Sequence, residues 1–395
     1  MPWLHGVPRA RAREASRGAC DEIKRTMTDR PLHHANPAPE RDTRHWAIEA
    51  WRGVAAFMVL VAHWWTPLGW SGPFSGFAFT GVDVFFVLSG FVFAPQICGH
   101  SPIRLGDYAL RRVARIYPAY LLALGLYVGL RWWEGKPLQY LPEHLLMAHL
   151  QSREMAFYYS PPFWSLPSEV AFYGAVPLLA ALSVSRFARA GWWALVMGAV
   201  GLRVWLIANA DVVGQNMAYV VLYHLPGLLV EFLLGVWAYR QLRGEAPAMA
   251  NGSPRRQAWP WLLLGTLVGL ASLAAFHALE AGRGHSLLHG QAGLGVAVAA
   301  ALMLVGSAWW NPSAAWLRDL GTWAGRLSYS VYLLHPLWGV GLAEWRAKWG
   351  AWPALMVAIT GLLLTSWAVH RWIEEPARVW ARRRGALQNT SVSPG

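Results

Sequence analysis

The sequence contains little charge and little cysteine. Only 14% of its 395 residues are charged and 55% are hydrophobic, so the mean hydropathy is positive, at +0.28. The two cysteines, Cys20 and Cys98, provide neither a disulfide framework nor a metal-ligand spacing. Residues 1–45 have no apolar run of the kind that forms a secretory signal, and we expect them to be a disordered cytoplasmic tail. This composition indicates an integral membrane protein.

The excess of positive charge does not indicate a nucleic-acid-binding protein. The net charge is +13, but the arginines lie in short loops between apolar runs and form no basic domain. Tryptophan is abundant, with 26 residues, as expected where indole rings lie at the membrane–water interface. The partner that these features predict is the lipid bilayer.

Apolar segments recur along the chain at lengths that can cross a bilayer. We predict an all-α integral membrane protein, a bundle of about ten transmembrane helices within residues 46–378, followed by a basic cytoplasmic tail, 379–395. With both termini in the cytoplasm, most arginines fall in inner loops, as the positive-inside rule requires. The predicted spans are 46–67, 79–98, 113–131, 163–183, 191–208, 219–239, 259–278, 291–308, 327–343 and 353–373.

The first span carries the pair of residues that most suggests function. Arg52 and His63 are 11 positions apart, which places them on nearly the same helix face, about 16 Å apart along the axis. Ionisable groups inside a span are costly, so a pair on one face indicates a functional site. The alternative is an arginine that reaches the interface together with a histidine hydrogen-bonded between helices.

Further polar residues can be placed by depth. Asp83 and Glu169 are expected near the outer face, at a depth similar to that of His63. A loop at the inner face is expected to hold three arginines, which either anchor the topology or bind phosphate. These arginines are Arg111, Arg112 and Arg115.

Other embedded polar residues allow a structural explanation. Arg203 and Glu231, in neighbouring spans, are expected to pair with each other. Ser328, Tyr332 and His335 share one face of the ninth span, either as a hydrogen-bonding seam or as substrate contacts. The pair Glu374 and Glu375 is expected to neutralise the inner arginines.

Several segments together resemble the bacterial acyltransferase-3 family of integral-membrane O-acyltransferases. They occur in the family's order and extend over about 47–378. The matching segments are Arg52 to His63, GVDVFFVLSGF (81–91), RRVARIYP (111–118), WSLPSEVAFY (164–173), LSYSVYLLH (327–335) and IEEP (373–376).

The resemblance implies transfer of an acyl group, acetyl above all, from acyl-CoA to a hydroxyl of a sugar, surface polysaccharide or lipid-linked glycan at the bacterial inner membrane. It implies no tightly bound cofactor and no metal. Arg111, Arg112, Arg115 and also Arg52 would bind the phosphates of the donor. A secondary transporter for a sugar or an organic anion is the alternative, and it predicts paired repeats that the sequence does not show.

The residues and the resemblance together imply roles for individual side chains of the site. His63 would deprotonate the acceptor, or would form an acyl-histidine intermediate. Asp83 or Glu169 would orient the imidazole or bind sugar hydroxyls. The candidate substrate contacts are Trp164, Ser165, Tyr329, Tyr332 and His335.

Overall fold

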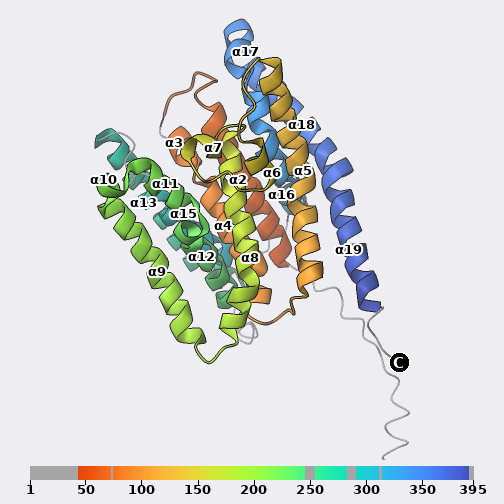
Figure 1. Cartoon of the computed structure of the whole chain (residues 1–395). Helices are drawn as coiled ribbons and strands as arrows, with labels where there is room; N and C mark the ends of the chain where they lie inside the picture. Colours follow the sequence, from red (N-terminus) through yellow and green to blue (C-terminus); the bar gives the residue numbers. More distant parts are fainter. Residues whose placement is uncertain (1–42, 73, 245–253, 283–290, 311–313, 391–395) are drawn as a thin grey trace, which may run out of the picture. The chain divides into compact units, whose positions relative to one another are not determined.

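The computed structural model describes residues 43–72, 74–244, 254–282, 291–310 and 314–390, and this part of the chain is helical with no strand (Figure 1). The predicted all-α class is therefore confirmed. The predicted N-terminal tail lies outside the described residues up to residue 42. The membrane-length helices are α2 (Thr43–Trp64), α4 (Gly81–Ile97), α5 (Leu105–Trp133), α8 (Ser165–Ser183), α9 (Ala188–Ala208), α12 (Leu225–Gly244), α13 (Pro254–Gly282), α15 (Ala292–Trp309), α16 (Ala315–Gly339) and α18 (Ala351–Val369).

Shorter helices connect or extend these ten. A π-helical turn, η3 (His370–Glu374), joins α18 to the last helix, α19. The others are α3 (Phe74–Ala78), α6 (Leu141–Leu145), α7 (Arg153–Ala156), the 3-10 turn η1 (Pro161–Trp164), α10 (Ala210–Val213), α11 (Gln215–Tyr223), α17 (Leu342–Trp349) and α19 (Glu375–Thr390).

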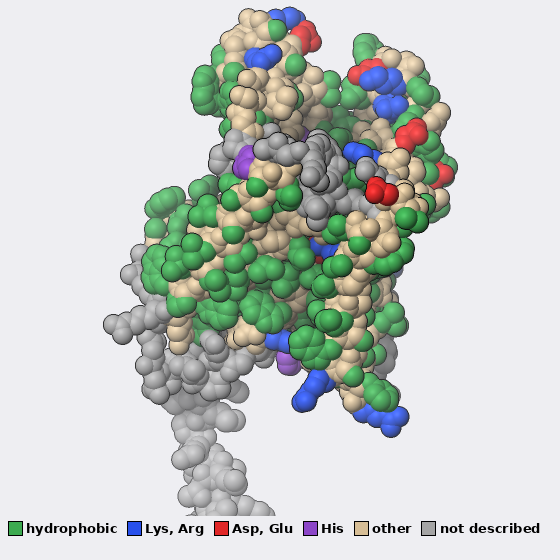
Figure 2. Space-filling model, turned by 90° about the vertical axis from the view of Figure 1, so that its left-hand side faces the viewer, with side chains coloured by type: hydrophobic (Ala, Val, Ile, Leu, Met, Phe, Trp, Pro, Cys, Tyr) green, Lys and Arg blue, Asp and Glu red, His purple; other side chains and the backbone are tan. Residues whose placement is uncertain are grey.

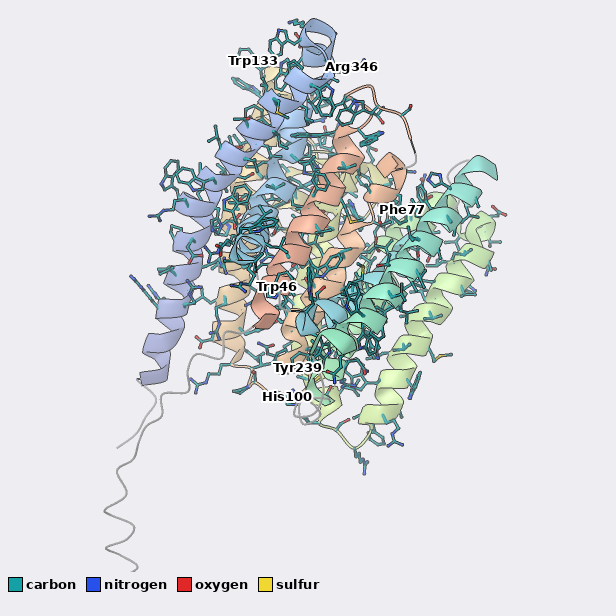
Figure 3. The ribbon with its side chains drawn as sticks, turned by 180° about the vertical axis from the view of Figure 1, so that it is seen from behind. Trp46, Phe77, His100, Trp133, Tyr239 and Arg346 are labelled. Carbon is teal, nitrogen blue, oxygen red and sulfur yellow. The ribbon has the colours of Figure 1, made fainter. Side chains whose placement is uncertain are left out.

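The helices form a multi-pass membrane protein. Eight helical segments of the described chain are long and apolar enough to cross a bilayer. α2 and α16, with 22 and 25 residues, are long enough but carry more polar groups, so the predicted count of ten stays a prediction. In Figure 2, hydrophobic side chains form a broad band, while most lysines, arginines and acidic side chains gather above and below it. Figure 3 shows Trp133 and Arg346 at one end of the helices and His100 and Tyr239 at the other.

One predicted boundary is wrong. α5 begins at Leu105 rather than 113, because Arg104 is extended and Asp107 supplies an acidic group to the first turn. The three arginines expected in a loop therefore lie on a helix. The predicted span 219–239 lies within one candidate membrane-spanning segment, Asn216–Leu242, which consists of α11 and α12 with His224 extended between them. Residues 379–390 of the predicted C-terminal tail belong to α19, which packs beside α5.

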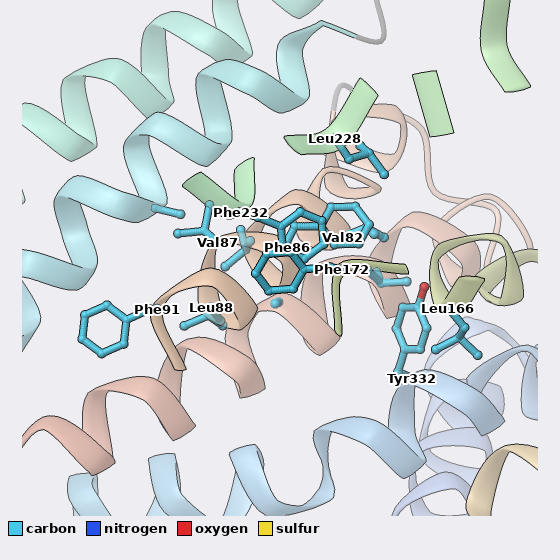
Figure 4. Close-up of a cluster of buried hydrophobic side chains, with 14 of the residues drawn as sticks. Val82, Phe86, Val87, Leu88, Phe91, Leu166, Phe172, Leu228, Phe232 and Tyr332 are labelled. Atoms are coloured by element: carbon cyan, nitrogen blue, oxygen red, sulfur yellow. The ribbon is translucent and has the colours of Figure 1, made fainter. Parts of the chain in front are cut away.

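The helices pack in a series in which α4 and α2 occupy the middle. α13 packs on α15, α15 and α4 on α12, α2 on α4, and α16 on both α2 and α18. The α4–α12 contact includes Phe86 and Phe232, whose ring centroids are 5.0 Å apart, and Phe172 from α8 stacks on Phe232 at 3.9 Å (Figure 4). These aromatic rings fill the space between the central helices.

Glycines allow α2 and α16 to approach closely. A Cβ atom at Gly53 would lie 2.6 Å from the Cβ atom of Ala324, and one at Gly321 would lie 2.9 Å from that of Ala50. At Gly325 an added Cβ atom would collide with the backbone oxygen of Glu49. Small residues at such positions let membrane helices pack backbone to backbone.

This packing predicts opposite effects for two glycine substitutions. Gly325→Ala should lower the midpoint of thermal unfolding in detergent, because the added methyl forces α2 and α16 apart at a cost of about 1–3 kcal/mol. Gly125→Ala, on α5, is the control because nothing lies within 4 Å of its added Cβ atom. The control should keep or raise the midpoint, since alanine favours a helix over glycine. Equal midpoints for the two variants would contradict the close approach.

The connection between α5 and α8 is held by a pair of buried histidines. The rings of His144 and His149 are stacked, with centroids 4.1 Å apart, and the Tyr120 hydroxyl donates to the carbonyl oxygen of His144. Burial, followed by repulsion from His149, lowers the pKa of His144 to about 4.

The histidine pair predicts acid sensitivity. Because the pKa of His144 is lower in the folded state, protons bind preferentially to the unfolded state as the pH falls from the ordinary histidine value toward about 4. Acidification over this range should therefore lower the free energy of unfolding. The thermal midpoint of His144→Phe should fall less between about pH 7 and about pH 5 than that of the wild type. An identical fall in both proteins would show that His144 does not contribute.

Candidate active site

Two histidines meet where α2 and α16 pack together. The Nε2 atom of His335 lies 3.2 Å from the Nδ1 atom of His63, and the ring centroids are 4.9 Å apart. His335 is fully buried, whereas His63 is half-buried. The Trp64 indole N–H donates to the carbonyl oxygen of His335 at 2.9 Å, which ties the two helices together at this point.

The hydrogen bonds of this pair determine which nitrogen carries each proton. His335 Nδ1 lies 3.1 Å from the carbonyl oxygen of Val331, which can only accept, so Nδ1 is the donor and Nε2 keeps its lone pair. His63 Nδ1 lies 2.8 Å from the carbonyl oxygen of Val59 and also faces the lone pair of His335, so it carries a hydrogen. The lone pair of His63 is consequently on Nε2, where it can act as a base or a nucleophile.

Two of the predicted substrate contacts form a network beside this pair. The hydroxyls of Ser165 and Tyr332 are 2.6 Å apart, and the Tyr332 hydroxyl donates to the carbonyl oxygen of Pro162 at 2.7 Å. The ring of Tyr332 lies 6.3 Å from that of His335. These side chains therefore join the start of α8 to the helix that carries His335.

The other predicted contact on α8, Trp164, lies against a second aromatic ring. Its ring centroid is 4.4 Å from that of Tyr223. A pocket of about 170 Å³ lies nearby, between the connection that follows α6, the first turn of α8 and the break between α11 and α12. Its lining includes Met147, Ser168 and His224.

A second polar group surrounds Arg115. This arginine interacts electrostatically with Glu374, Glu169 and Glu49, and its guanidinium lies over the ring of Tyr329 at 5.8 Å. Glu49 also pairs with Arg52, with 3.2 Å between Oε1 and Nη1. Arg52, Arg115 and Glu169, predicted at different depths, thus belong to one electrostatic group.

The carboxylates predicted to orient His63 lie elsewhere. Glu169 accepts hydrogen bonds from the hydroxyls of Tyr173 and of Ser89, the latter at 3.4 Å. Within the described part of the chain, no carboxylate interacts electrostatically with either ring of the histidine pair. Both carboxylates contact other groups in this structure, so the roles expected for Asp83 or Glu169, orienting the imidazole or binding sugar hydroxyls, stay predictions.

Asp83 belongs to a third buried group. A Cβ atom at Gly293 of α15 would lie 2.6 Å from the carboxylate of Asp83, and this carboxylate interacts electrostatically with Glu231 and Arg203. Arg203 pairs with Glu231 and donates from Nε to the carbonyl oxygen of Gly227 at 2.6 Å. The predicted Arg203–Glu231 pair is confirmed.

The remaining arginines differ in their surroundings. The guanidinium of Arg112 lies over the ring of Phe93 at 4.8 Å and over the rings of Tyr108 and Tyr173 at 5.7 Å each. No described carboxylate lies within ion-pair distance of it. Arg111 is more exposed and lies 3.9 Å from Asp107. Arg112 is therefore the arginine of this segment best prepared to receive an anion.

Glu374 interacts electrostatically with Arg115, in agreement with the expectation that it pairs with the inner arginines. It is buried at the end of the π-helical turn, accepts a hydrogen bond from the Ser330 hydroxyl, and lies 3.3 Å from Nδ1 of His370. π-Turns inside helices occur frequently at functional sites. The Glu-Glu-Pro segment was the available signal, but the turn that directs Glu374 inward cannot be read from composition.

Comparisons with known proteins indicate acyl transfer. Residues 45–371 match a family model described as an acyltransferase domain. A stretch of 224 residues is 28% identical to "Putative membrane-bound transacylase BcsY" of Komagataeibacter xylinus, covering 51% of this chain and 53% of that protein. The chain thus spans about half the length of this relative. No solved structure shows significant similarity.

Proposed function

Because the chain belongs to the acyltransferase-3 family, we propose that this multi-pass membrane acyltransferase moves an acetyl group from acetyl-CoA to a hydroxyl of a sugar, polysaccharide or lipid-linked glycan. The observation that carries the proposal is the lone pair on Nε2 of His63, a half-buried nitrogen with no hydrogen-bond partner among the described residues. We place the protein in the bacterial inner membrane, with ten spans and both ends in the cytoplasm.

The reaction follows from this nitrogen. His63 Nε2 accepts the proton of the acceptor hydroxyl while the oxygen attacks the thioester carbonyl carbon. The carbon–oxygen bond forms, the carbon–sulfur bond breaks, and CoA leaves as a thiolate that takes the proton from His63. An acyl-histidine intermediate would use the same nitrogen as a nucleophile.

The donor phosphates are assigned to the arginines at the start of α5. Arg115 already interacts with three carboxylates, whereas no described carboxylate acts on Arg112, which lies over aromatic rings. Arg112, with Arg111 at the surface, is therefore the stronger phosphate ligand, because its charge is not neutralised. Arg52 and Arg115 would add further positive charge near the donor phosphates. The histidine lies about 16 Å further along α2 than Arg52, a separation that the extended arm of the donor would bridge.

The acceptor is assigned to the outer side of the histidine pair. Trp164 and Tyr223 offer aromatic faces suited to a sugar ring, and the paired hydroxyls of Ser165 and Tyr332 hold the start of α8 beside them. A binding site with a few polar groups and apolar walls is typical of small-molecule pockets.

Removing the reacting nitrogen tests the function. His63→Ala should lower acetyl transfer by about 10²–10⁴-fold, because the base is lost. The measurement is release of free CoA from acetyl-CoA by membranes that contain the protein and its natural acceptor. His277→Ala, another half-buried histidine on α13, is the control and should retain activity. Activity retained in His63→Ala would place the chemistry elsewhere, and no CoA release by the wild type would favour a transporter.

The arginines allow a test of the donor site. Arg112→Ala should weaken acetyl-CoA binding by about 10- to 100-fold, since a charge-assisted contact contributes roughly 1.5–3 kcal/mol. Arg112→Lys should restore it only in part, because an ammonium lacks the guanidinium fork. Arg240→Ala is the control, an arginine that also stacks on an aromatic ring, with its guanidinium 4.8 Å from Trp192. Calorimetry on the purified variants measures the affinity, and an unchanged value for Arg112→Ala would remove Arg112 from the donor site.

A further inference from the structure

We propose that His335 is a positioning residue for His63, taking the place that a carboxylate has in other histidine-based sites. The proposal rests on the function assigned above to His63. His335 is fully buried, so it cannot touch a substrate, and its one free lone pair faces His63. His335 therefore acts only through His63.

Several contacts hold His335 in one orientation. Its Nδ1–H donates to the carbonyl oxygen of Val331, one turn earlier on α16, and its own carbonyl oxygen accepts from the Trp64 indole. The ring of Tyr332 lies beside it at 6.3 Å. Because the carbonyl oxygen of Val331 can only accept, the imidazole cannot present an N–H to His63 without losing that bond. Its acceptor nitrogen is therefore directed at His63.

The arrangement stabilises the charge that forms on His63 during transfer. When Nε2 of His63 takes a proton, the ring becomes a cation whose Nδ1–H still faces two acceptors, the carbonyl oxygen of Val59 and Nε2 of His335. No carboxylate of the described chain acts on either ring. A neutral acceptor suits this apolar interior, because a second buried charge would need solvation or a partner of its own when His63 is neutral.

A pair of substitutions distinguishes positioning from packing. His335→Gln keeps an acceptor near the position of Nε2, whereas His335→Phe fills the same space without one. Two readouts are compared on the full-length protein. The first is incorporation of radiolabelled acetyl from acetyl-CoA in membranes that contain the natural acceptor. The second is carbethoxylation of His63 by diethylpyrocarbonate, which attacks an unprotonated imidazole nitrogen and needs no acceptor substrate.

We expect His335→Phe to lower the maximal rate of acetyl incorporation by about 10- to 100-fold without changing the half-saturating acetyl-CoA concentration. It should also slow carbethoxylation of His63, while His335→Gln should retain most of both. His335→Leu is tested in parallel, so that a folding failure of the Phe variant leaves the comparison with Gln in place.

Two results would overturn the inference: equal behaviour of the Gln variant and the apolar variants, or an unchanged carbethoxylation rate of His63 in the apolar variants. If the wild type incorporates no acetyl but the carbethoxylation contrast persists, the proposed function fails and the role of His335 stands.

Discussion

The backbone contact between α2 and α16 is the constraint on which the histidine pair depends. Gly53, Gly321 and Gly325 remove the side chains that would separate these helices. Only at this separation can two rings that are 272 positions apart in the chain share a hydrogen bond. In a bilayer, apolar side chains gain little by leaving lipid, so close van der Waals packing of this kind decides which helices associate. Packing and chemistry are therefore set by the same helix pair.

The polar residues of the membrane interior form separate groups. In each group the free-energy cost of burying a polar side chain is offset in a different way. Arg203 is neutralised by Glu231, with Asp83 beside them. Arg115 interacts electrostatically with several carboxylates, including Glu374. The histidine pair makes hydrogen bonds to backbone carbonyl oxygens, and no described carboxylate acts on it. An ionic group inside a span requires a partner or an aqueous cavity, and a neutral imidazole requires only hydrogen bonds. The nitrogen proposed to react thus lies apart from the buried carboxylates of the described chain.

Much of the candidate site could be predicted from the sequence, since a polar residue within an apolar run is conspicuous. His63, Arg52 and Arg115 were identified in this way. The partners were harder to predict, because they depend on how each helix is rotated and on which helices touch. Asp83 shares a depth with His63 in the sequence-based prediction but faces α15, while His335 comes from α16. The three arginines expected in a loop lie on α5 because that helix begins eight residues earlier than predicted.

The sequence by itself determined that this protein is helical, crosses a membrane several times and belongs to an acyltransferase family, because hydropathy and short motifs are local properties of the chain. It also identified the polar residues within membrane spans, whose burial in the bilayer is costly. Only the tertiary structure decided that His63 pairs with another histidine, that Glu169 interacts with Arg115, and that a π-helical turn directs Glu374 inward. Those contacts join residues that are distant in the chain, and they follow from helix packing, which local sequence patterns do not encode.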